Sequence, residues 1–421
     1  MVLLSKARSA PADGNSTQLS NISRMTRPGL GAPATQPSRA QLLVMASVTA
    51  LTIANVYYVQ PLLVEIGRDL HVSDGTVSLV STAAQVGYAL GLLLLAPLGD
   101  IVARRRLIVV LTSAAALLSL ATAAAPTLPL LLVALLCVGF CSPVPQLVVP
   151  LAAAITSPAQ RGKVVGTVQI GVVVGILGSR TVAGAISSLL GWRWVFVAAA
   201  LGLAALLPLL LRHLPHTPST RTVPYRQLIG SMPRLFARYP LVPQACISGA
   251  ATGVALIAFW TGAVFMLADR YGWGPMQVGL LTLVALASAA VTPLAGHFAD
   301  RRGIRVAALT AGATLVASYA AFLGASASIP LLLLGVALLD GGMQANQVVN
   351  QLALFRLDPA ITSRVNAVYM LWRYAGMGSG SVLGAAAWLH AGWLGVCAVG
   401  GVASAIVVLV HLRAPRFDAR P

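Results

Sequence analysis

The chain has 421 residues, of which 57% are hydrophobic and 9% are charged, and its formal net charge is +18. Soluble domains carry roughly 25% charged residues, so this composition excludes a water-facing globular surface and favours lipid surroundings. The basic residues form short clusters between long apolar stretches, which argues against a nucleic-acid partner despite the charge. The four cysteines lie in apolar stretches and indicate neither a disulfide framework nor a metal site.

The chain begins with a polar segment and continues as a series of apolar stretches. Residues 1–40 are rich in Ser, Pro, Ala, Thr and Gly, which predicts a disordered tail. A membrane-spanning helix needs about 20 mostly apolar residues. Stretches of this kind are predicted at 41–63, 77–98, 107–125, 128–151, 164–188, 192–213, 242–266, 276–297, 304–324, 330–352, 365–388 and 392–412. Because backbone groups in lipid must be satisfied within the segment, we expect an all-α integral membrane protein with twelve helices.

The basic residues predict how the helices are oriented. Nearly all Lys and Arg outside the helices fall in the tail, the polar segment 214–240, the C-terminal end 414–421 and alternate loops. Arg68, Arg193 and Arg270 alone fall in the opposite loops. Positive loops stay on the cytoplasmic side, so both termini and the 214–240 linker are predicted to be cytoplasmic.

The two halves of the chain repeat each other. Gly191-Trp192 recurs 201 residues later as Gly392-Trp393. A charged loop also recurs after 200 residues: the first copy contains Asp100, Arg104 and Arg105, and the second contains Gly296, Asp300, Arg301, Gly303 and Arg305. These matches predict two six-helix bundles, at 41–213 and 241–413. Such repeats are typical of transporters, in which two bodies rock about one central site.

Over residues 41–413 the chain resembles the major facilitator superfamily. Its charged loops are similar to that family's signature Gly-x-x-x-Asp-Arg-x-Gly-Arg-Arg, and the first copy departs from it at Ala96, Ile101 and Ala103. The resemblance implies secondary transport by a cofactor-free chain. It also implies that Asp100 with Arg104, and Asp300 with Arg301, form a latch that joins the halves on the cytoplasmic side; a plain positive-inside anchor is the alternative for the arginines.

Two shorter segments resemble bacterial drug-type members of this superfamily. Gly171, Gly175 and Gly178 resemble the glycine-rich fifth helix of drug–proton antiporters, although Ile176 replaces the expected proline. The segment 55–61 resembles the first helix of drug-type members. The resemblance implies proton-coupled export of amphipathic or drug-like compounds by a protein of the bacterial cytoplasmic membrane that is functional as a monomer. An importer of a small metabolite or organic anion is the alternative, and a non-transporting sensor is a remote one.

No enzyme motif is present: the chain has no His-Glu-x-x-His, no phosphate-binding loop and no catalytic Cys/His arrangement. For a transporter of this kind, the expected partners are a small-molecule substrate, protons and membrane lipid.

Ionisable residues within the predicted helices are few, and such residues are usually functional. Asp340 and Arg373 lie about half-way along their helices, which places both near the membrane midplane. We expect them to face each other, so that protonation of Asp340 releases Arg373 and couples protons to transport. A permanent ion pair, or an Asp340 that faces a water-filled crevice, is the alternative. Arg180 lies in the outer half of its helix, as an outer gate or as a side chain that snorkels to the headgroups.

Polar and aromatic side chains supply candidates for a substrate cavity. Helices 1, 4, 7 and 10 line the cavity in the superfamily, and helix 11 borders it. Aromatic rings beside a few polar groups suit an amphipathic ligand, although each residue alone could equally serve packing. The candidates are Asn55, Tyr58, Gln60, Gln146, Trp260, Gln344, Gln347, Tyr369 and Trp372.

Overall fold

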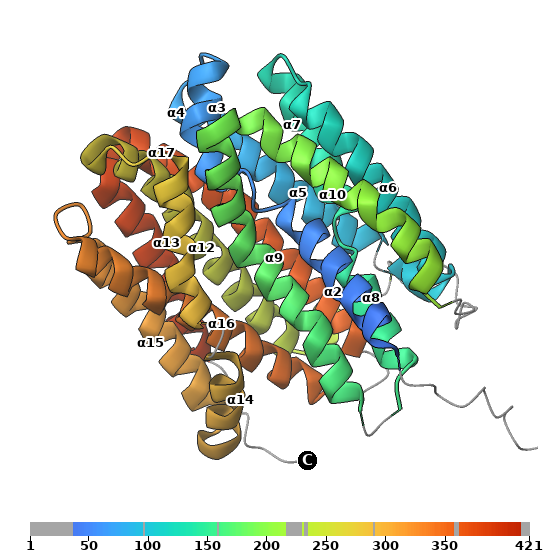
Figure 1. Cartoon of the computed structure of the whole chain (residues 1–421). Coiled ribbons are helices and arrows are strands. Elements are labelled where there is room, and N and C mark those ends of the chain that lie inside the picture. Colours follow the sequence, from blue (N-terminus) through green and yellow to red (C-terminus); the bar gives the residue numbers. More distant parts are fainter. Residues whose placement is uncertain are drawn as a thin grey trace, which may run out of the picture.

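The computed structural model describes residues 37–413 apart from 96, 158–159, 216–229, 231–234, 289–290 and 358–361. The predicted N-terminal and C-terminal tails and most of the 214–240 linker lie outside the described residues. The described part is helical, without a strand, and its helices run side by side in one bundle (Figure 1). This confirms the all-α fold expected from the sequence.

Nine helical spans in the described ranges are long and apolar enough to cross a membrane. Two shorter apolar helices, Arg39–Ala54 and Pro275–Val284, accompany them. One of the nine, Arg364–Arg413, is 50 residues long and lies within α17 (Thr362–Arg413). Its backbone leaves the helical conformation at Gly392, where φ is 57° and ψ is −147°, so α17 is two helices joined at a sharp turn.

The turn at Gly392 has a counterpart in the first half. Gly191 separates α9 (Arg161–Leu190) from α10 (Trp192–His213) and has φ of 93°. Positive φ is readily adopted by glycine alone, so the repeated Gly-Trp pair marks the same turn in both halves.

The first predicted helix is not continuous. The sequence predicted one span over 41–63, but α2 (Arg39–Ala54) ends at Ala54 and turns fill residues 55–59. A 3-10 turn, η1 (Gln60–Leu62), and a short helix, α3 (Leu63–Asp69), follow. Pro61 has no N–H to donate to the carbonyl of Tyr57, four residues before it, so an α-helix cannot continue through this point unchanged.

The fourth predicted span is broken as well. Instead of one helix over 128–151, α7 (Leu128–Cys141) is followed by a break and then by α8 (Pro145–Ala154). Pro143 and Pro145 explain the break. The two breaks are neighbours, because Asn55 Nδ2 donates a hydrogen bond to Ser142 Oγ at 3.4 Å.

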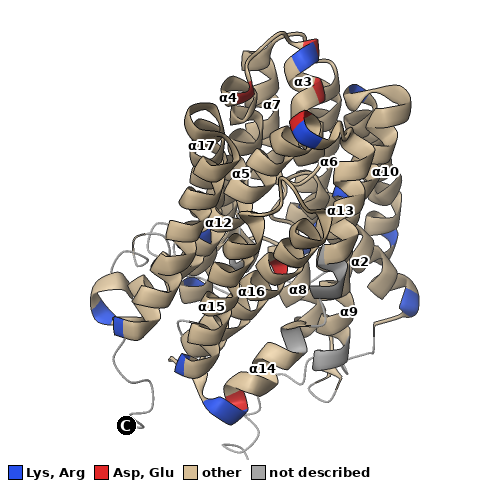
Figure 2. Ribbon diagram, turned by 90° about the vertical axis from the view of Figure 1, so that its left-hand side faces the viewer, with Lys and Arg blue, Asp and Glu red and all other residues tan. Residues whose placement is uncertain are grey.

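The remaining elements follow the predicted spans closely. They are α4 (Asp74–Val77), α5 (Leu79–Leu95), η2 (Pro97–Asp100), α6 (Arg104–Ala123), α12 (Leu241–Tyr271), α13 (Pro275–Ser288), α14 (Val291–Arg302), α15 (Ile304–Phe322) and α16 (Ile329–Phe355). Charged bands lie mostly at the two ends of the bundle, with few between (Figure 2). We call these ends the α3 end and the α14 end.

The N-terminal and C-terminal halves meet mainly toward the α3 end. There α5 packs against α17, and α9 packs against α13. Ser381 Oγ donates to the Ser78 carbonyl at 2.9 Å, and Thr181 Oγ1 donates to the Gly279 carbonyl at 2.9 Å. The side chain of Leu389 in α17 lies directly over Gly75 in α4. These contacts seal the α3 end of the interface between the halves.

Candidate functional site

Arg180 lies at the centre of a polar cluster inside the bundle. Its side chain is 1% exposed, although it belongs to the long apolar helix α9. Its Nε donates to Gln60 Oε1 at 2.6 Å, and its Cζ lies 4.3 Å from the centroid of the Trp260 ring and 5.1 Å from that of Tyr57. A desolvated cation–π contact stabilises a guanidinium by about 2 kcal/mol. Arg180 therefore points into the protein, which excludes the alternative that it snorkels to the headgroups.

The break in the first helix supplies two of these partners. Gln60 and Tyr57 lie on the irregular segment between α2 and α3, and both are buried. Helix α12 supplies Trp260 from the other half of the chain. Arg180 is thus held between the two halves.

Asp340 of α16 is the acidic member of this cluster. It is 4% exposed and interacts electrostatically with Arg180. The sequence suggested Arg373 as its partner, but the described residues show no ion pair between Asp340 and Arg373. Arg180 is the cation whose charge acts on Asp340, but the described residues show no ion pair between these two side chains either.

Several buried polar atoms of this cluster lack a hydrogen-bond partner among the described residues. The unsatisfied donors are Gln60 Nε2, Arg180 Nη2 and Trp260 Nε1, and the unsatisfied acceptor is Asp340 Oδ2. Leaving one such atom buried without a partner costs about 1–3 kcal/mol. The three donors belong to residues in contact around Arg180, and with Asp340 Oδ2 they indicate a site that is completed by a ligand or by water.

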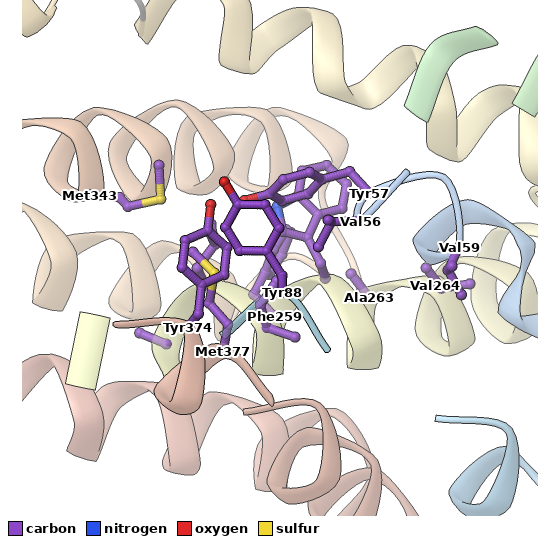
Figure 3. Close-up of a cluster of buried hydrophobic side chains, with 14 of the residues drawn as sticks. Val56, Tyr57, Val59, Tyr88, Phe259, Ala263, Val264, Met343, Tyr374 and Met377 are labelled. Carbon is purple, nitrogen blue, oxygen red and sulfur yellow. The ribbon is translucent and has the colours of Figure 1, made fainter. Parts of the chain in front are cut away.

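Three tyrosines form an aromatic wall next to Arg180: Tyr57 from the break in the first helix, Tyr88 from α5 and Tyr374 from α17. The rings of Tyr57, Tyr88 and Tyr374 gather at one place, with Met343 and Met377 close by (Figure 3). The Tyr88 and Tyr374 centroids are 4.3 Å apart, with the rings inclined at 42°. Sequence reasoning missed Tyr88 and Tyr374. Phenol groups inside otherwise apolar helices were the signal that could have identified them.

A second buried arginine lies in α17. Arg373 is 3% exposed, and its Nη1 has no hydrogen-bond partner among the described residues. It interacts electrostatically with the hydroxyls of Tyr369 and Tyr374. The Tyr369 hydroxyl is likewise buried without a partner in this part of the chain, and its ring lies over Gly249 of α12.

The polar residues of α16 beyond Asp340 serve mainly to join helices. Asn346 and Asn350 donate to Ser248 of α12 at 3.0 and 3.2 Å. Ser248 also contacts Nε2 of the buried His411 at 3.0 Å, and Gln244 Nε2 donates to His411 Nδ1 at 3.2 Å. This network ties α12, α16 and the second part of α17 together.

Five other predicted cavity residues are buried or half-buried. Asn55 and Tyr58 are buried at the break of the first helix. Gln146, Gln344 and Gln347 are half-buried, and Gln146 interacts with Tyr88 of the aromatic wall.

Trp372 lies outside the cluster. It is 43% exposed and packs against Phe236, with ring centroids 5.8 Å apart. Its neighbour Arg373 faces inward, and consecutive residues of a helix lie on different faces, so Trp372 faces outward.

The two charged loops make matching contacts at the α14 end. Arg105 Nη2 donates to the carbonyl of Leu211 near the end of α10, and Arg305 Nη2 donates at 2.7 Å to the carbonyl of Leu412 near the end of α17. The last carbonyls of a helix have no partner within the helix and carry partial negative charge, so arginine stabilises them. Each arginine thus binds the last helix of its own half.

Arg104, one of the predicted latch residues, contacts its own loop. Arg104 Nε donates to the Gly99 carbonyl at 3.1 Å. Asp300 and Arg301 are exposed, and Gly296 has open space beside it. The Asp100 side chain lies outside the described residues.

The departure at Ala103 has a structural explanation. Gly303 has φ of 88°, whereas Ala103 has φ of −54°. The first copy of the loop therefore takes a different backbone at this position, which needs no glycine.

Two carboxylates of α3 form hydrogen bonds to residues at the turn between α9 and α10, at the α3 end. Glu65 accepts from Ser187 Oγ and, at 3.1 Å, from the backbone N–H of Trp192. Asp69 accepts from Trp192 Nε1 at 3.1 Å and pairs with Arg193. The hydrogen bond from Arg193 holds the pKa of Asp69 below its usual value.

Two hollows open beside these carboxylates, of about 570 and 340 Å³. The smaller one lies between the halves, since it is lined by α3 and α9 on one side and by α12 and α13 on the other.

Comparison with known proteins identifies the family. The model of the Major Facilitator Superfamily matches residues 45–381. The chain belongs to the major facilitator superfamily. An uncharacterized transporter, YgaY, of Escherichia coli O157:H7 is 37% identical over 377 residues, which cover 89% of this chain and 96% of that protein. A probable transporter of Streptomyces coelicolor is 34% identical over 397 residues, with coverage of 93% and 92%.

Solved structures of this superfamily share the fold. The crystal structure of a D-xylose–proton symporter superposes with a TM-score of 0.72 at 16% identity, over 90% of this chain and 99% of that one. The major facilitator chain described here is therefore a transporter, a multi-pass integral protein of the bacterial plasma membrane and not an enzyme, as the sequence predicted.

Proposed function

We propose that this chain is a proton-coupled secondary transporter and that Asp340 carries the coupling proton. The observation on which this rests is a buried carboxylate, Asp340, that lies within electrostatic range of the buried Arg180 inside the bundle. Asp340 Oδ2 is buried without a hydrogen-bond partner among the described residues, so it offers a place for a proton. A protonated Asp340 is neutral, loses its attraction for Arg180 and leaves that guanidinium available to cargo.

The topology that we propose has twelve crossings in two six-helix bundles, 41–213 and 241–413, with the linker 214–240 and both termini in the cytoplasm. The arginines of both charged loops at the α14 end support this orientation, because positive charge remains on the cytoplasmic side. The α3 end then faces outward. With the halves sealed at that end, the molecule has the arrangement expected of an inward-facing state.

The two ends of the interface have complementary roles in this proposal. Opening to the outside separates α5 from α17 and α9 from α13, while the α14 end closes. The latch residues Asp100, Arg104, Asp300 and Arg301 would then engage between the halves. The exposed positions of Asp300 and Arg301 in the present arrangement fit a latch that is open.

Export of amphipathic or drug-like compounds is the direction that we propose. Its support is the glycine stripe of α9, in which Gly171 and Gly175 lie against the backbone of Ala46 and Ala50 in α2. This stripe is the segment that resembles drug–proton antiporters. A second candidate is symport of an organic anion with a proton. It is favoured because unsatisfied donors outnumber unsatisfied acceptors around Arg180.

The test follows proton movement in inverted vesicles with a pH-sensitive dye while compounds are added one at a time. Asp340→Asn removes the proton site and keeps the shape of the side chain. We expect the variant to lose substrate-dependent proton movement and the pH dependence of transport. Asp269→Asn, at an exposed position, is the matched control and retains both. Unchanged pH dependence in Asp340→Asn would rule out this coupling site.

A further inference from the structure

The buried part of the bundle contains more positive than negative charge. The chain has ten acidic residues. Among the described side chains only Asp340 is buried. Two guanidiniums, Arg180 and Arg373, are buried with it. The other acids lie toward the ends of the bundle or outside the described side chains: Asp13, Glu65, Asp69, Asp74, Asp100, Asp269, Asp300, Asp358 and Asp418.

The single buried carboxylate interacts electrostatically with the first arginine, although the described residues show no ion pair between Asp340 and either arginine. Arg180 has the charge of Asp340, the side-chain oxygen Oε1 of Gln60 and two aromatic rings around it. Arg373 has no comparable set of groups around it. In the part of the chain that the structure describes it forms no ion pair, and its Nη1 is enclosed without a hydrogen-bond partner. Its polar neighbours are tyrosines, which carry no negative charge at neutral pH.

A lone buried guanidinium is costly. Removing such a charge from water costs several kcal/mol, and arginine does not escape this cost by losing its proton. The fixed residues around Arg373 do not offset it. An anion that enters and leaves would supply the missing charge, and within a transport path such an anion is the cargo itself.

We infer that the cargo is a small organic anion whose acidic group binds Arg373 and the Tyr369 hydroxyl. This inference rests on the proposed transport function. A carboxylate matches the donor fork of a guanidinium, and the Tyr369 O–H has no acceptor among the described residues.

The surroundings of Arg373 indicate the rest of the cargo. Tyr374 interacts electrostatically with Arg373 on one side and with Tyr57 on the other, and Tyr57 lies against Arg180. The aromatic wall therefore lies between the two arginines. Its rings and the thioethers of Met343 and Met377 suit an apolar or aromatic body of the ligand (Figure 3).

The test measures binding to the purified full-length protein in detergent, without a proton gradient. The probes are 3-phenylpropionate, its amide and 3-phenylpropylamine, which share one body and carry charges of about −1, 0 and +1. Melting temperature and quenching of tryptophan fluorescence report binding. We expect the carboxylate to bind at least about tenfold more tightly than the amide, and the amine to bind least. Equal binding of carboxylate and amide would overturn the inference.

Variants of Arg373 provide the second arm. Arg373→Met removes the lone cation, so we expect a higher melting temperature without ligand, together with loss of the preference for the carboxylate over the amide. Arg373→Lys keeps the positive charge but loses the paired donors of the guanidinium, so we expect a weaker preference for the carboxylate over the amide. Arg270→Met, at an exposed site, leaves both measurements unchanged.

Two results would contradict the assignment. One is a carboxylate preference that survives Arg373→Met. The other is stabilisation by chloride or sulfate equal to that by 3-phenylpropionate, which would make the counterion inorganic. Neither readout needs proton coupling, so failure of the Asp340 experiment and failure of this one are distinguishable.

Discussion

At the scale of single residues, two buried tryptophans differ in whether their indole N–H has an acceptor in the protein. Trp260 stacks on Arg180 and has an unpartnered Nε1–H among the described residues, whereas Trp393 donates its Nε1–H to the Phe322 carbonyl at 2.6 Å. Both are buried in the same half of the chain. The difference in hydrogen bonding predicts opposite effects of the same substitution.

Trp260→Phe removes a donor that has no protein partner, so we expect little change in stability. If that donor binds cargo, affinity falls by about tenfold, as for the loss of one hydrogen bond. Trp393→Phe leaves the Phe322 carbonyl without its partner and lowers stability by about 1–3 kcal/mol, with affinity unchanged. Thermal unfolding and equilibrium binding check both effects. A loss of stability in Trp260→Phe without a loss of affinity would show that Trp260 serves packing.

The ion pair between Asp69 and Arg193 predicts a dependence on pH. The folded state lowers the pKa of Asp69, so its contribution to stability is present above the unfolded pKa and is lost as pH falls through the folded pKa. We expect Asp69→Asn to melt below the native protein at pH 7 and the difference to shrink below about pH 4. The pair is partly exposed, so the effect is at most about 1 kcal/mol. A difference that grows toward low pH would exclude this origin.

At the scale of helices, the glycines of α9 provide a matched pair of sites. A Cβ at Gly175 would collide with the backbone of Ala50 in α2, whereas a Cβ at Gly178 would meet nothing within 4 Å. We expect Gly175→Ala to lower the melting temperature by separating α9 from α2. Gly178→Ala should raise it slightly, because alanine stabilises a helix interior by up to about 1 kcal/mol relative to glycine. Equal responses of the two variants would show that close packing of α2 and α9 is not required.

The sequence predicted where helices lie better than where they break. Apolar composition identifies a membrane helix, but it continues unchanged through residues 55–59 and 142–144, so both breaks were missed. Pro61, Pro143 and Pro145 carried the signal. Partners inside the bundle were not predictable in the same way. Arg180 and Arg373 look alike in sequence, and only the structure shows that Arg180, rather than Arg373, interacts electrostatically with Asp340.

At the scale of the whole molecule, transport requires the α3 end to open. Gly75 of α4 and Leu389 of α17 touch across the seam between the halves. We expect Gly75→Cys combined with Leu389→Cys to form a disulfide under mild oxidation and to stop transport. Reduction then restores transport, and each single variant transports normally under the same oxidation. A cross-linked protein that still transports would show that the halves do not separate at this end.

Among the described side chains, the two buried guanidiniums outnumber the one buried carboxylate, which indicates an anionic cargo. The charge of that cargo determines how the membrane voltage affects transport. A monoanion that crosses together with one proton transfers no net charge, so the membrane voltage does no net work per transport cycle. The same anion exchanged for a proton moves two elementary charges per cycle. Each of these charges is worth about 2.3 kcal/mol per 100 mV. The electrical response of the transporter would therefore distinguish symport of an anion from its export, even before its natural substrate is identified.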